Sequence, residues 1–294
     1  MRMRPGATSG KPLSSVPSIR GAFAALLLGA LACTAGPRGS GSETGADAVA
    51  LRVVAYNIKH GRGMDDVVDL VRIADVLRSL NADVIALQEV DDRTDRTGGV
   101  DQVGVLGELL GYRGVHGPHR PYQGGHYGNA VLTRLPIGTT ITHAIPSASG
   151  SALAVLEVEV VTERGPVSVV SVHLAGSPDE RMAQADVITE LFAGRSKPVV
   201  LAGDFNGRPD DAVVEALRSR WMVLEKSGAR LTYPADEPDR EIDFVMIQRD
   251  ALLQPMRHVV APEAVASDHR PLIADFRFGT SSPSPAPRHE APPV

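Results

Sequence analysis

The stretch VVLAGDFNGRPDD (199–211) joins an apolar run to polar residues that a protein core does not normally hold. Five apolar or small residues (199–203) lead directly into Asp204, Phe205 and Asn206, and a glycine and a proline then end the run. In an extended strand, Asp204 and Asn206 would point to the same face. A buried carboxylate beside an amide costs free energy unless a metal ion, another cation or a substrate uses it. The alternative is an ordinary strand end with a turn, because Asp, Asn, Gly and Pro all favour turns.

Apolar, β-branched runs recur along the chain and predict further strands. Together with the opening stretch, these runs lie at 51–56, 83–90, 129–134, 152–161, 166–174, 198–205, 242–247 and 271–278. Helical periodicity occurs between them, at 66–80, 177–192 and 210–220. The second of these segments begins with Ser177, Pro178 and Glu180, the pattern of a capping box. Mostly hairpin-connected strands with helices between them predict an α/β domain of helix-covered sheets, mixed or antiparallel.

Polar side chains recur where the predicted strands begin or end. They are Asn57, Glu89, His173, Asp204, Asn206, Asp243, Asp268 and His269. Taken singly, each has an ordinary explanation, such as a turn residue, an edge charge or a core histidine. Strand ends of one sheet system converge on one rim, however, and four carboxylates there would repel one another. A divalent cation would relieve that repulsion, and oxygen ligands favour Mg²⁺, Mn²⁺ or Ca²⁺ over Zn²⁺.

The two ends of the chain have compositions that do not indicate a folded domain. Residues 1–33 resemble an export signal: a basic stretch precedes the apolar segment GAFAALLLGALA (21–32), and Cys33 follows it. Cys33 is the only cysteine and stands where a bacterial lipobox has its lipidated residue, although ordinary cleavage near the ALA is the alternative. We expect a flexible linker at 34–50 and a disordered Pro/Ser-rich tail at 279–294. Either form of processing places the protein outside the cytoplasm, held at the membrane by a lipid or secreted.

The overall charge argues against a nucleic-acid-binding surface. The chain of 294 residues has a formal net charge of −5, and 43% of its residues are hydrophobic. Removing the first fifty residues leaves 25 basic against 33 acidic residues, a balance of about −8. Such a domain would on average repel a polyanion, although a local basic groove remains compatible with it. We expect a monomer.

Seven motifs in this order resemble the endonuclease/exonuclease/phosphatase superfamily of metal-dependent phosphoesterases. It includes pancreatic-type deoxyribonucleases, abasic-site endonucleases, neutral sphingomyelinases and inositol polyphosphate 5-phosphatases. The motifs are VVAYNIKHGRG (53–63), ALQEVD (86–91), YGNAVLTRLPI (127–137), SVHL (171–174), LAGDFN (201–206), IDFV (242–245) and SDHRPL (267–272). The resemblance implies a four-layer α/β sandwich over about 51–278, with two packed mixed sheets flanked by helices and an active site across their rim.

The resemblance also implies roles for the metal side of the site. Asn57 and Glu89 would bind Mg²⁺, with Mn²⁺ or Ca²⁺ as alternatives, and Glu89 would be the principal ligand. Asp268 would be a second carboxylate on the metal side and would also orient His269. His269 would activate water or bind the phosphate.

Other residues would contact the phosphoester substrate. Asp204 and Asn206 would hold the attacking water and the phosphate, His173 would contact phosphate oxygens, and Asp243 would support the phosphate-binding residues. Asn129, in the YGNAVL motif, is a weaker candidate for substrate binding. The segment SASGSALAVL (147–156) carries no charge where many relatives carry Glu or Arg, so Arg62 or Arg134 would supply any phosphate contact missing there.

The motifs do not identify the substrate, because members of one fold family differ in the loops that hold it. The segment 114–128 is either a substrate loop or an ordinary surface loop. Few lysines and one tryptophan favour a small phosphodiester or phosphomonoester, including a lipid headgroup, over DNA or RNA. The alternative of a different class is a non-catalytic binding module that retains the fold.

Overall fold

Two six-stranded sheets make up the centre of the computed structural model, which describes residues 49–147, 152–249 and 252–279. The first sheet contains β1 (Leu51–Asn57), β2 (Val84–Asp92), β3 (Arg113–Tyr122), β4 (Gly125–Thr133), β11 (Leu253–Val260) and β12 (Leu272–Phe278). The second contains β5 (Ile137–Ile145), β6 (Leu153–Thr162), β7 (Gly165–His173), β8 (Val199–Asp204), β9 (Trp221–Val223) and β10 (Asp243–Gln248). The α-helices are α1 (Leu70–Leu80), α2 (Gln102–Leu110), α3 (Pro178–Phe192) and α4 (Ala212–Arg218).

Both sheets are mixed. Their strand orders are β11-β12-β1-β2-β4-β3 and β5-β6-β7-β8-β10-β9. The pairs β1–β2 and β7–β8 are parallel, and the other neighbours are antiparallel. Each parallel pair is joined through a helix, as a crossover between parallel strands requires.

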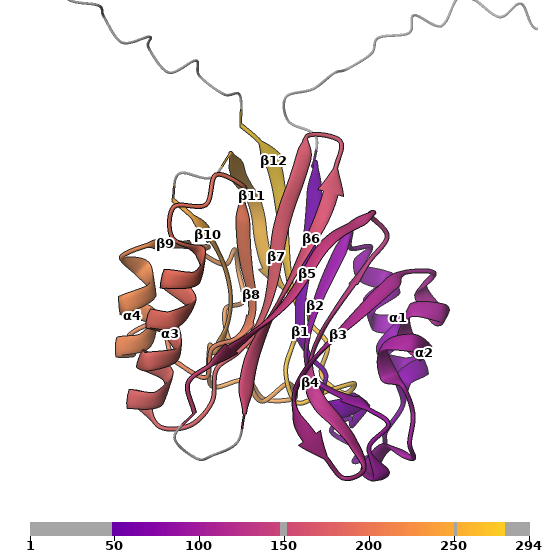
Figure 1. Cartoon of the computed structure of the whole chain (residues 1–294). Helices are drawn as coiled ribbons and strands as arrows, with labels where there is room; N and C mark the ends of the chain where they lie inside the picture. Colours follow the sequence, from indigo (N-terminus) through magenta and orange to yellow (C-terminus); the bar gives the residue numbers. More distant parts are fainter. Residues whose placement is uncertain (1–48, 148–151, 250–251, 280–294) are drawn as a thin grey trace, which may run out of the picture. The chain divides into compact units, whose positions relative to one another are not determined.

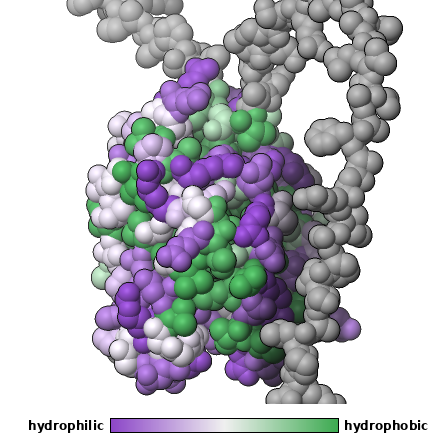
Figure 2. Space-filling model, turned by 90° about the vertical axis from the view of Figure 1, so that its right-hand side faces the viewer, coloured by the Kyte–Doolittle hydropathy of each residue, from purple (hydrophilic) through white to green (hydrophobic). Residues whose placement is uncertain are grey.

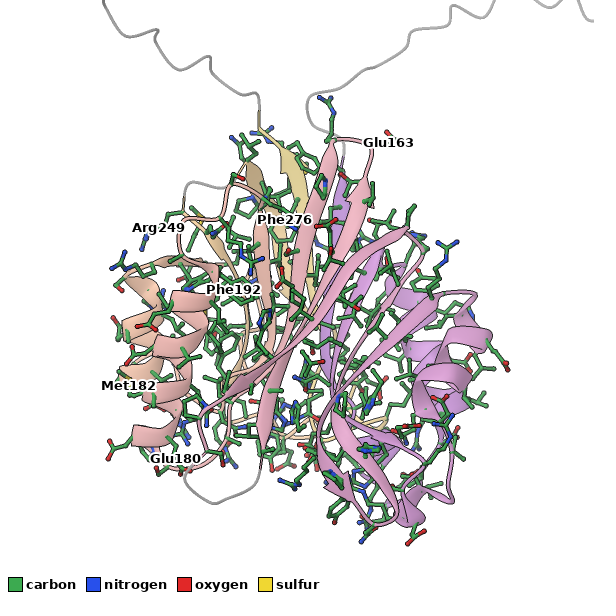
Figure 3. All side chains as sticks on the ribbon, viewed as in Figure 1. Glu163, Glu180, Met182, Phe192, Arg249 and Phe276 are labelled. Carbon is green, nitrogen blue, oxygen red and sulfur yellow. The ribbon has the colours of Figure 1, made fainter. Side chains whose placement is uncertain are left out.

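Three apolar clusters hold four layers together (Figure 1). One lies between the sheets and joins residues such as Val53 and Phe276 of the first sheet to Val169 and Val245 of the second. The second packs α3 and α4 on the outer face of the second sheet, and the third packs α1 and α2 on the first. In Figure 3, Phe276 points between the sheets and Phe192 lies between α3 and its sheet. The expected four-layer α/β sandwich is confirmed.

The helices begin where side chains cap them. The capping box at Ser177 is present: Glu180 N donates to Ser177 Oγ at 3.3 Å, and Ser177 N donates to Glu180 Oε2 at 2.8 Å. The first helix starts at Leu70, four residues later than expected, because the Asp69 side chain accepts from Arg72 N and ends the preceding extended segment. The third expected helix is shorter than predicted, at Ala212–Arg218.

Four strands and one helix were not expected from the sequence. The strands β3, β5, β9 and β11 are the two edges of each sheet, and the helix is α2. The prediction of a loop at 114–128 is therefore wrong, because this segment forms most of the β3–β4 hairpin. Its two prolines are tolerated because β3 is an edge strand.

The strand directions separate the domain's ends from its polar rim. Leu51 pairs with Phe276, so the first and last strands enter and leave side by side. Asn57, at the other end of β1, pairs with Gln88 of β2. The predicted strand-end residues therefore collect on the rim away from the domain's termini.

The surface combines polar and apolar areas. Figure 2 shows hydrophobic side chains among polar ones on the side that carries α1 and α2. Exposed apolar residues there include Met64, Val67 and Val71. Among the described residues, no helix is long and apolar enough to cross a membrane. The export signal, Cys33, most of the linker and the C-terminal tail lie outside the described residues.

Candidate active site

Strand register places three of the predicted residues in one row. His173, the last residue of β7, pairs with Asp204 of β8, and Asp204 pairs with Asp243 of β10. All three side chains are buried. His173 Nε2 lies 3.8 Å from Asp204 Oδ2. The apolar run at 199–203 therefore ends in a carboxylate because β8 is central in its sheet and its end meets two other polar strand ends.

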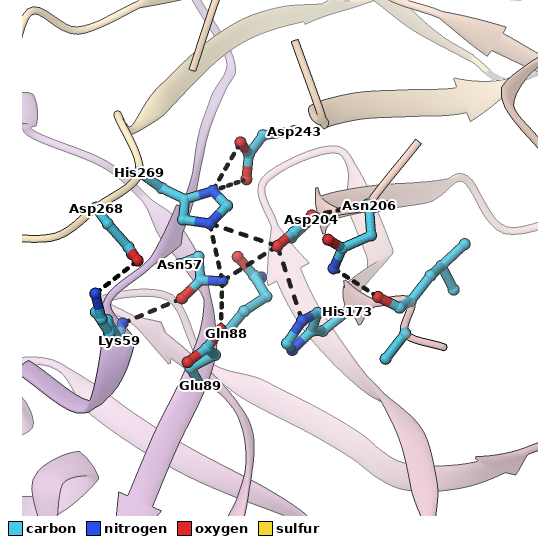
Figure 4. A network of polar contacts seen from close by, with 12 residues as sticks. Asn57, Lys59, Gln88, Glu89, His173, Asp204, Asn206, Asp243, Asp268 and His269 are labelled. Carbon is cyan, nitrogen blue, oxygen red and sulfur yellow. Dashed lines mark hydrogen bonds and ion pairs between the residues drawn. The ribbon is translucent and has the colours of Figure 1, made fainter. Parts of the chain in front are cut away.

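We expected Asn206 to stand beside Asp204 in an extended strand, and the structure shows that it does not. Strand β8 ends at Asp204, and Asn206 takes a left-handed conformation with φ of 47°. Its backbone N–H donates to Asp204 Oδ1 at 2.8 Å, and its side-chain Nδ2 donates to Leu174 O at 2.8 Å. The turn interpretation therefore holds for Asn206, while Asp204 Oδ2 remains directed toward the other polar residues (Figure 4).

The first sheet contributes Asn57 and Glu89. Asn57 Nδ2 donates to Glu89 Oε1 at 3.0 Å and to Asp204 Oδ2 at 3.2 Å, so this amide bridges the two sheets. Glu89 lies at a register shift between β2 and β4 and has a positive φ of 58°. Ser267 Oγ donates to the Asn57 carbonyl at 2.7 Å and so fastens the SDH segment to the end of β1. Glu89 and Asp204 thus converge on one amide group (Figure 4).

His269 is oriented by Asp243 and not by Asp268. Its Nδ1 lies 3.0 Å from Asp243 Oδ2, and its Nε2 lies 3.7 Å from Asp204 Oδ2. The ring of Tyr233 lies 4.8 Å from the imidazole, centroid to centroid. The expected contact between Asp268 and His269 is wrong because adjacent side chains point in different directions, and Asp268 instead forms an ion pair with Lys59 Nζ at 2.8 Å. The assignment of Asp243 to the phosphate-binding residues changes accordingly, since its carboxylate is engaged by the imidazole.

Burial and charge shift two pKa values at the centre. Burial alone would lower the pKa of His269, but the charges of Asp243 and Asp204 outweigh it and raise that pKa to about 10. Burial raises the pKa of Asp204 to about 6, against the opposing effect of the His269 charge. The centre therefore combines a carboxylate that titrates near neutrality with a neighbouring imidazolium.

Two groups of side chains could hold a cation. The potential ligand atoms of Asp204, Asp243 and His269 all lie within 4.8 Å of one another, but there the imidazolium already supplies positive charge. On the side of the first sheet, the carboxylates of Glu89 and Asp204 both accept from the amide of Asn57. This amide carries no net charge and does not balance theirs. Carboxylate and amide oxygens suit a hard divalent cation, so Glu89 and Asn57, with Asp268 nearby, fit a metal ion better.

The other predicted residues differ in how close they come to this centre. Asn129 Nδ2 donates to Ser171 O at 3.0 Å, and within the described residues its buried Oδ1 has no hydrogen-bond partner. Arg62 is paired with Asp66 in the loop after β1. Arg134 is held by Asp83 and Asn81, at the opposite end of β2, so it cannot contact a phosphate at the rim.

Sequence reasoning missed several residues around the centre. Gln88 Nε2 donates to Ser171 Oγ at 2.8 Å and joins the two sheets beneath Glu89. Its position beside Glu89 in the ALQEVD motif could have indicated this, because neighbouring strand residues point to opposite faces. Tyr233 lies outside every predicted strand, and no sequence pattern indicates that its ring packs against His269. Lys59, which pairs with Asp268, was not among the predicted site residues.

Two packed mixed sheets with a carboxylate–imidazole centre on their common rim place this chain in the class of phosphoester hydrolases. The model of the Endonuclease/Exonuclease/phosphatase family matches residues 54–269, and the chain belongs to this family, whose members are hydrolases that act on phosphoesters.

Proteins similar to this chain support the same assignment. The uncharacterized protein YbhP of Escherichia coli strain K12 is 26% identical over 226 residues, covering 71% of this chain and 88% of that protein. A crystal structure of an endonuclease/exonuclease/phosphatase from Beutenbergia cavernae is 25% identical with a TM-score of 0.63, covering 78% of this chain and 72% of that one. The mannosyl-6-phosphatase Bt3783 of Bacteroides thetaiotaomicron shares the fold, with 17% identity, a TM-score of 0.59 and coverage of 78% and 100%.

Proposed function

We propose that the protein is a divalent-metal-dependent phosphoesterase acting on a small phosphodiester or phosphomonoester, a class that includes lipid headgroups. The observation that carries this proposal is the convergence on Asp204. Its Oδ2 lies 3.2 Å from Asn57 Nδ2, 3.7 Å from His269 Nε2 and 3.8 Å from His173 Nε2. One buried carboxylate thus faces an amide and two imidazoles that come from both sheets.

The side chains of this centre divide the work of hydrolysis. Asp204 orients a water molecule and accepts its proton, for which a pKa of about 6 is suited at neutral pH. The His269 imidazolium, held by Asp243, donates to a non-bridging phosphate oxygen and stabilises the charge that develops there. His173, on the other side of Asp204, donates to a second phosphate oxygen. Strand register positions His173, and the contact with Asp243 positions His269, so little reorganisation is needed during the reaction.

A divalent metal ion fits the remaining donors. Glu89, Asn57 and Asp268 would hold it on the first-sheet side of the centre, with Mg²⁺ as the expected ion and Mn²⁺ or Ca²⁺ as alternatives. A bound divalent ion supplies positive charge to a phosphoryl oxygen and to the leaving oxygen. Lys59 Nζ, 2.8 Å from Asp268 Oδ2, holds that carboxylate in position at the rim.

Hydrolysis of bis(4-nitrophenyl) phosphate in Mg²⁺, with and without excess chelator, tests the proposal. We expect chelation and Asp204→Asn each to reduce the rate by about 1,000-fold or more. The matched control is Asp186→Asn on the exposed surface of α3, which should retain full activity. Calorimetric titration with Mg²⁺ gives an independent measurement, because Glu89→Gln should weaken binding whether or not this ester is turned over. Full activity in excess chelator would contradict the metal dependence, and full activity of Asp204→Asn would contradict the assigned centre.

We also propose that the protein is exported and anchored through a lipid on Cys33. The apolar segment before Cys33 and the Gly/Ser-rich linker after it support this proposal. The folded domain begins with β1, whose first residue lies at the opposite end of the strand from the site. Mass spectrometry of the mature N-terminus tests it, since an unmodified terminus at another residue would exclude lipidation.

A further inference from the structure

Two arginines and two tyrosines form a shelf beside Glu89 that the proposed chemistry does not use. The Arg–Tyr shelf consists of Arg96, Arg120, Tyr122 and Tyr127. Arg120 of β3 pairs with Tyr127 of β4, and Tyr127 pairs with Asp91 of β2, so one row crosses three adjacent strands. Asp91 stands two residues after Glu89. The shelf is therefore an extension of the rim along the first sheet.

The aromatic rings hold both guanidinium groups in place. Arg96 Cζ lies 4.7 Å from the centre of the Tyr122 ring and 5.5 Å from that of Tyr127. Arg120 Cζ lies 5.7 and 5.3 Å from the same two rings. Cation–π contacts at these distances are favourable and limit the conformations of a long side chain. The shelf thus presents its charges in a defined position.

The two arginines differ in charge balance. Arg96 donates to both oxygens of the buried Asp91 carboxylate, at 2.7 and 2.8 Å, and is neutralised by it. Within the part of the chain that the structure describes, Arg120 forms no ion pair with a carboxylate, and its guanidinium lies over the two rings. It is also half-buried, which makes an unbalanced charge less well solvated. Arg120 therefore has the capacity to bind an anion.

Charges from both the shelf and the proposed centre act on the phenol of Tyr127. The charges of Glu89 and Asp204 both raise the pKa of its phenol, after the larger effect of burial, and those of Arg96 and Arg120 lower it. Tyr127 stands on β4, between Arg120 on β3 and Glu89 on β2. Two strand spacings separate the backbone of β3 from that of β2, about 10 Å. A small substrate with anionic groups at its two ends can span a separation of this order.

We propose that Arg120, held by Tyr122 and Tyr127, binds a second oxyanion of the substrate, so that the enzyme selects small phosphoesters carrying another phosphate or carboxylate. The inference names the substrate class of the proposed function and rests on it for its catalytic consequence. A polyanion fits less well, because several basic residues at the rim already pair with carboxylates: Lys59 with Asp268, Arg62 with Asp66 and Arg240 with Asp239. The guanidinium of Arg120 matches one additional anionic group.

A binding experiment with non-hydrolysable phosphonates tests the subsite separately from catalysis. The probes are phenylphosphonate, 4-phosphonobenzoate and benzene-1,4-bisphosphonate, titrated calorimetrically into the full chain in Mg²⁺. We expect one or both of the two longer probes to bind about tenfold more tightly than phenylphosphonate, and their ratio identifies carboxylate or phosphate as the preferred second group. Arg120→Met should abolish this preference and leave phenylphosphonate binding unchanged. Arg113→Met, at the exposed other end of β3, is the matched control and should keep the preference.

A kinetic experiment tests the consequence for turnover. The substrates are bis(4-nitrophenyl) phosphate and 4-nitrophenyl 4-carboxyphenyl phosphate, which release the same nitrophenol. Arg120→Met should lower kcat/KM about tenfold for the second only, and Arg120→Lys should lower it less. Equal binding of all three phosphonates by the wild-type protein, or equal losses for both esters in Arg120→Met, would overturn the subsite. Preferential phosphonate binding without hydrolysis of either ester would contradict the proposed function alone. Nicking of plasmid DNA that depends on Arg120, without turnover of the small esters, would replace the small substrate by a nucleic acid.

Discussion

Two equally buried histidines, His269 on the rim and His258 in β11, lie in opposite electrostatic surroundings. They are 4% and 3% exposed. Each places Nδ1 3.0 Å from an oxygen acceptor, which is a carboxylate of Asp243 for His269 and the backbone carbonyl of Leu224 for His258. The two residues therefore share burial and hydrogen-bond length and differ in the charge of the partner.

That difference reverses the direction of the pKa shift. At His258, burial lowers the pKa and the nearby Lys226 charge lowers it further, to about 3. At His269, the same effect of burial is outweighed by Asp243 and Asp204, and the pKa rises to about 10. Burial alone thus keeps an imidazole neutral, and only paired carboxylates make it a cation. The comparison shows why the rim histidine is suited to chemistry and the other one to packing.

Lys226 joins the two regions. Its buried Nζ donates to Glu241 Oε1 at 2.8 Å and to the main-chain carbonyl of Asp243 at 2.9 Å. The lysine therefore holds the strand start that carries the carboxylate partner of His269. Its charge also disfavours protonation of His258. A single side chain thus supports the charged histidine indirectly and keeps the other one neutral.

The largest expected effect comes from replacing each histidine by the same neutral residue. We expect His269→Asn to lower kcat/KM for a phosphodiester by about 1,000-fold, because it removes the cationic donor at the phosphate. His258→Asn, the matched control, should stay within about threefold of wild type, because His258 faces a backbone carbonyl and no substrate. Steady-state kinetics on the two purified variants measures this. Similar losses in both variants would remove the functional distinction between the two regions.

The next effect concerns the carboxylate that sets the charge of His269. Asp243→Asn should lower activity by about 100-fold and shift the alkaline limb of the pH–rate profile to lower pH. The reason is that the Asp243 charge raises the pKa of His269, and an imidazolium donor is lost as pH rises through that pKa. Rate measurements from pH 6 to 10 on this variant and on Asp186→Asn test the sign. An alkaline limb that stays in place would show that Asp243 only positions the ring.

The smallest effect is on stability at acidic pH. The pKa of His258 is lowered on folding, so its contribution to stability is fully present above about pH 6.5 and is lost as pH falls toward about 3. In this window the unfolded state binds a proton that the folded state refuses. The free energy of unfolding should therefore fall by about 1.4 kcal/mol per pH unit for this residue.

Urea unfolding at pH 7, 6 and 5 measures the slope, and His258→Asn should flatten it by that amount. His119 is shifted in the same direction and contributes to the slope of both proteins, so only the difference between them reports on His258. A larger slope in the variant would contradict the assignment of His258 as a neutral buried residue.

Central strands, helix caps and the polar rim could be predicted from the sequence because local patterns encode them. A central strand buries both faces, so its apolar run is continuous, as in VVLAGD. The capping box at Ser177 is likewise contained in four consecutive residues. Residues at the first or last position of central strands, such as Asn57, Asp204 and Asp243, directly adjoin those runs. The sequence patterns by themselves therefore determined an α/β domain of helix-covered sheets and most members of the centre, and the family resemblance implied the four-layer sandwich.

Tertiary structure alone decided the sheet edges and the pairing of side chains. The unpredicted β3, β5, β9 and β11 are all edge strands, which expose one side, tolerate proline and polar residues, and gain their structure from a neighbour. The partner of His269 is Asp243, 26 residues away, and not the adjacent Asp268, because the loop before β12 packs against the start of β10 and so brings imidazole and carboxylate together. The placement of Arg120 over two tyrosines likewise requires the β3–β4 pairing. Patterns along the chain report burial, whereas contacts between distant residues depend on register, which only the packed sheets establish.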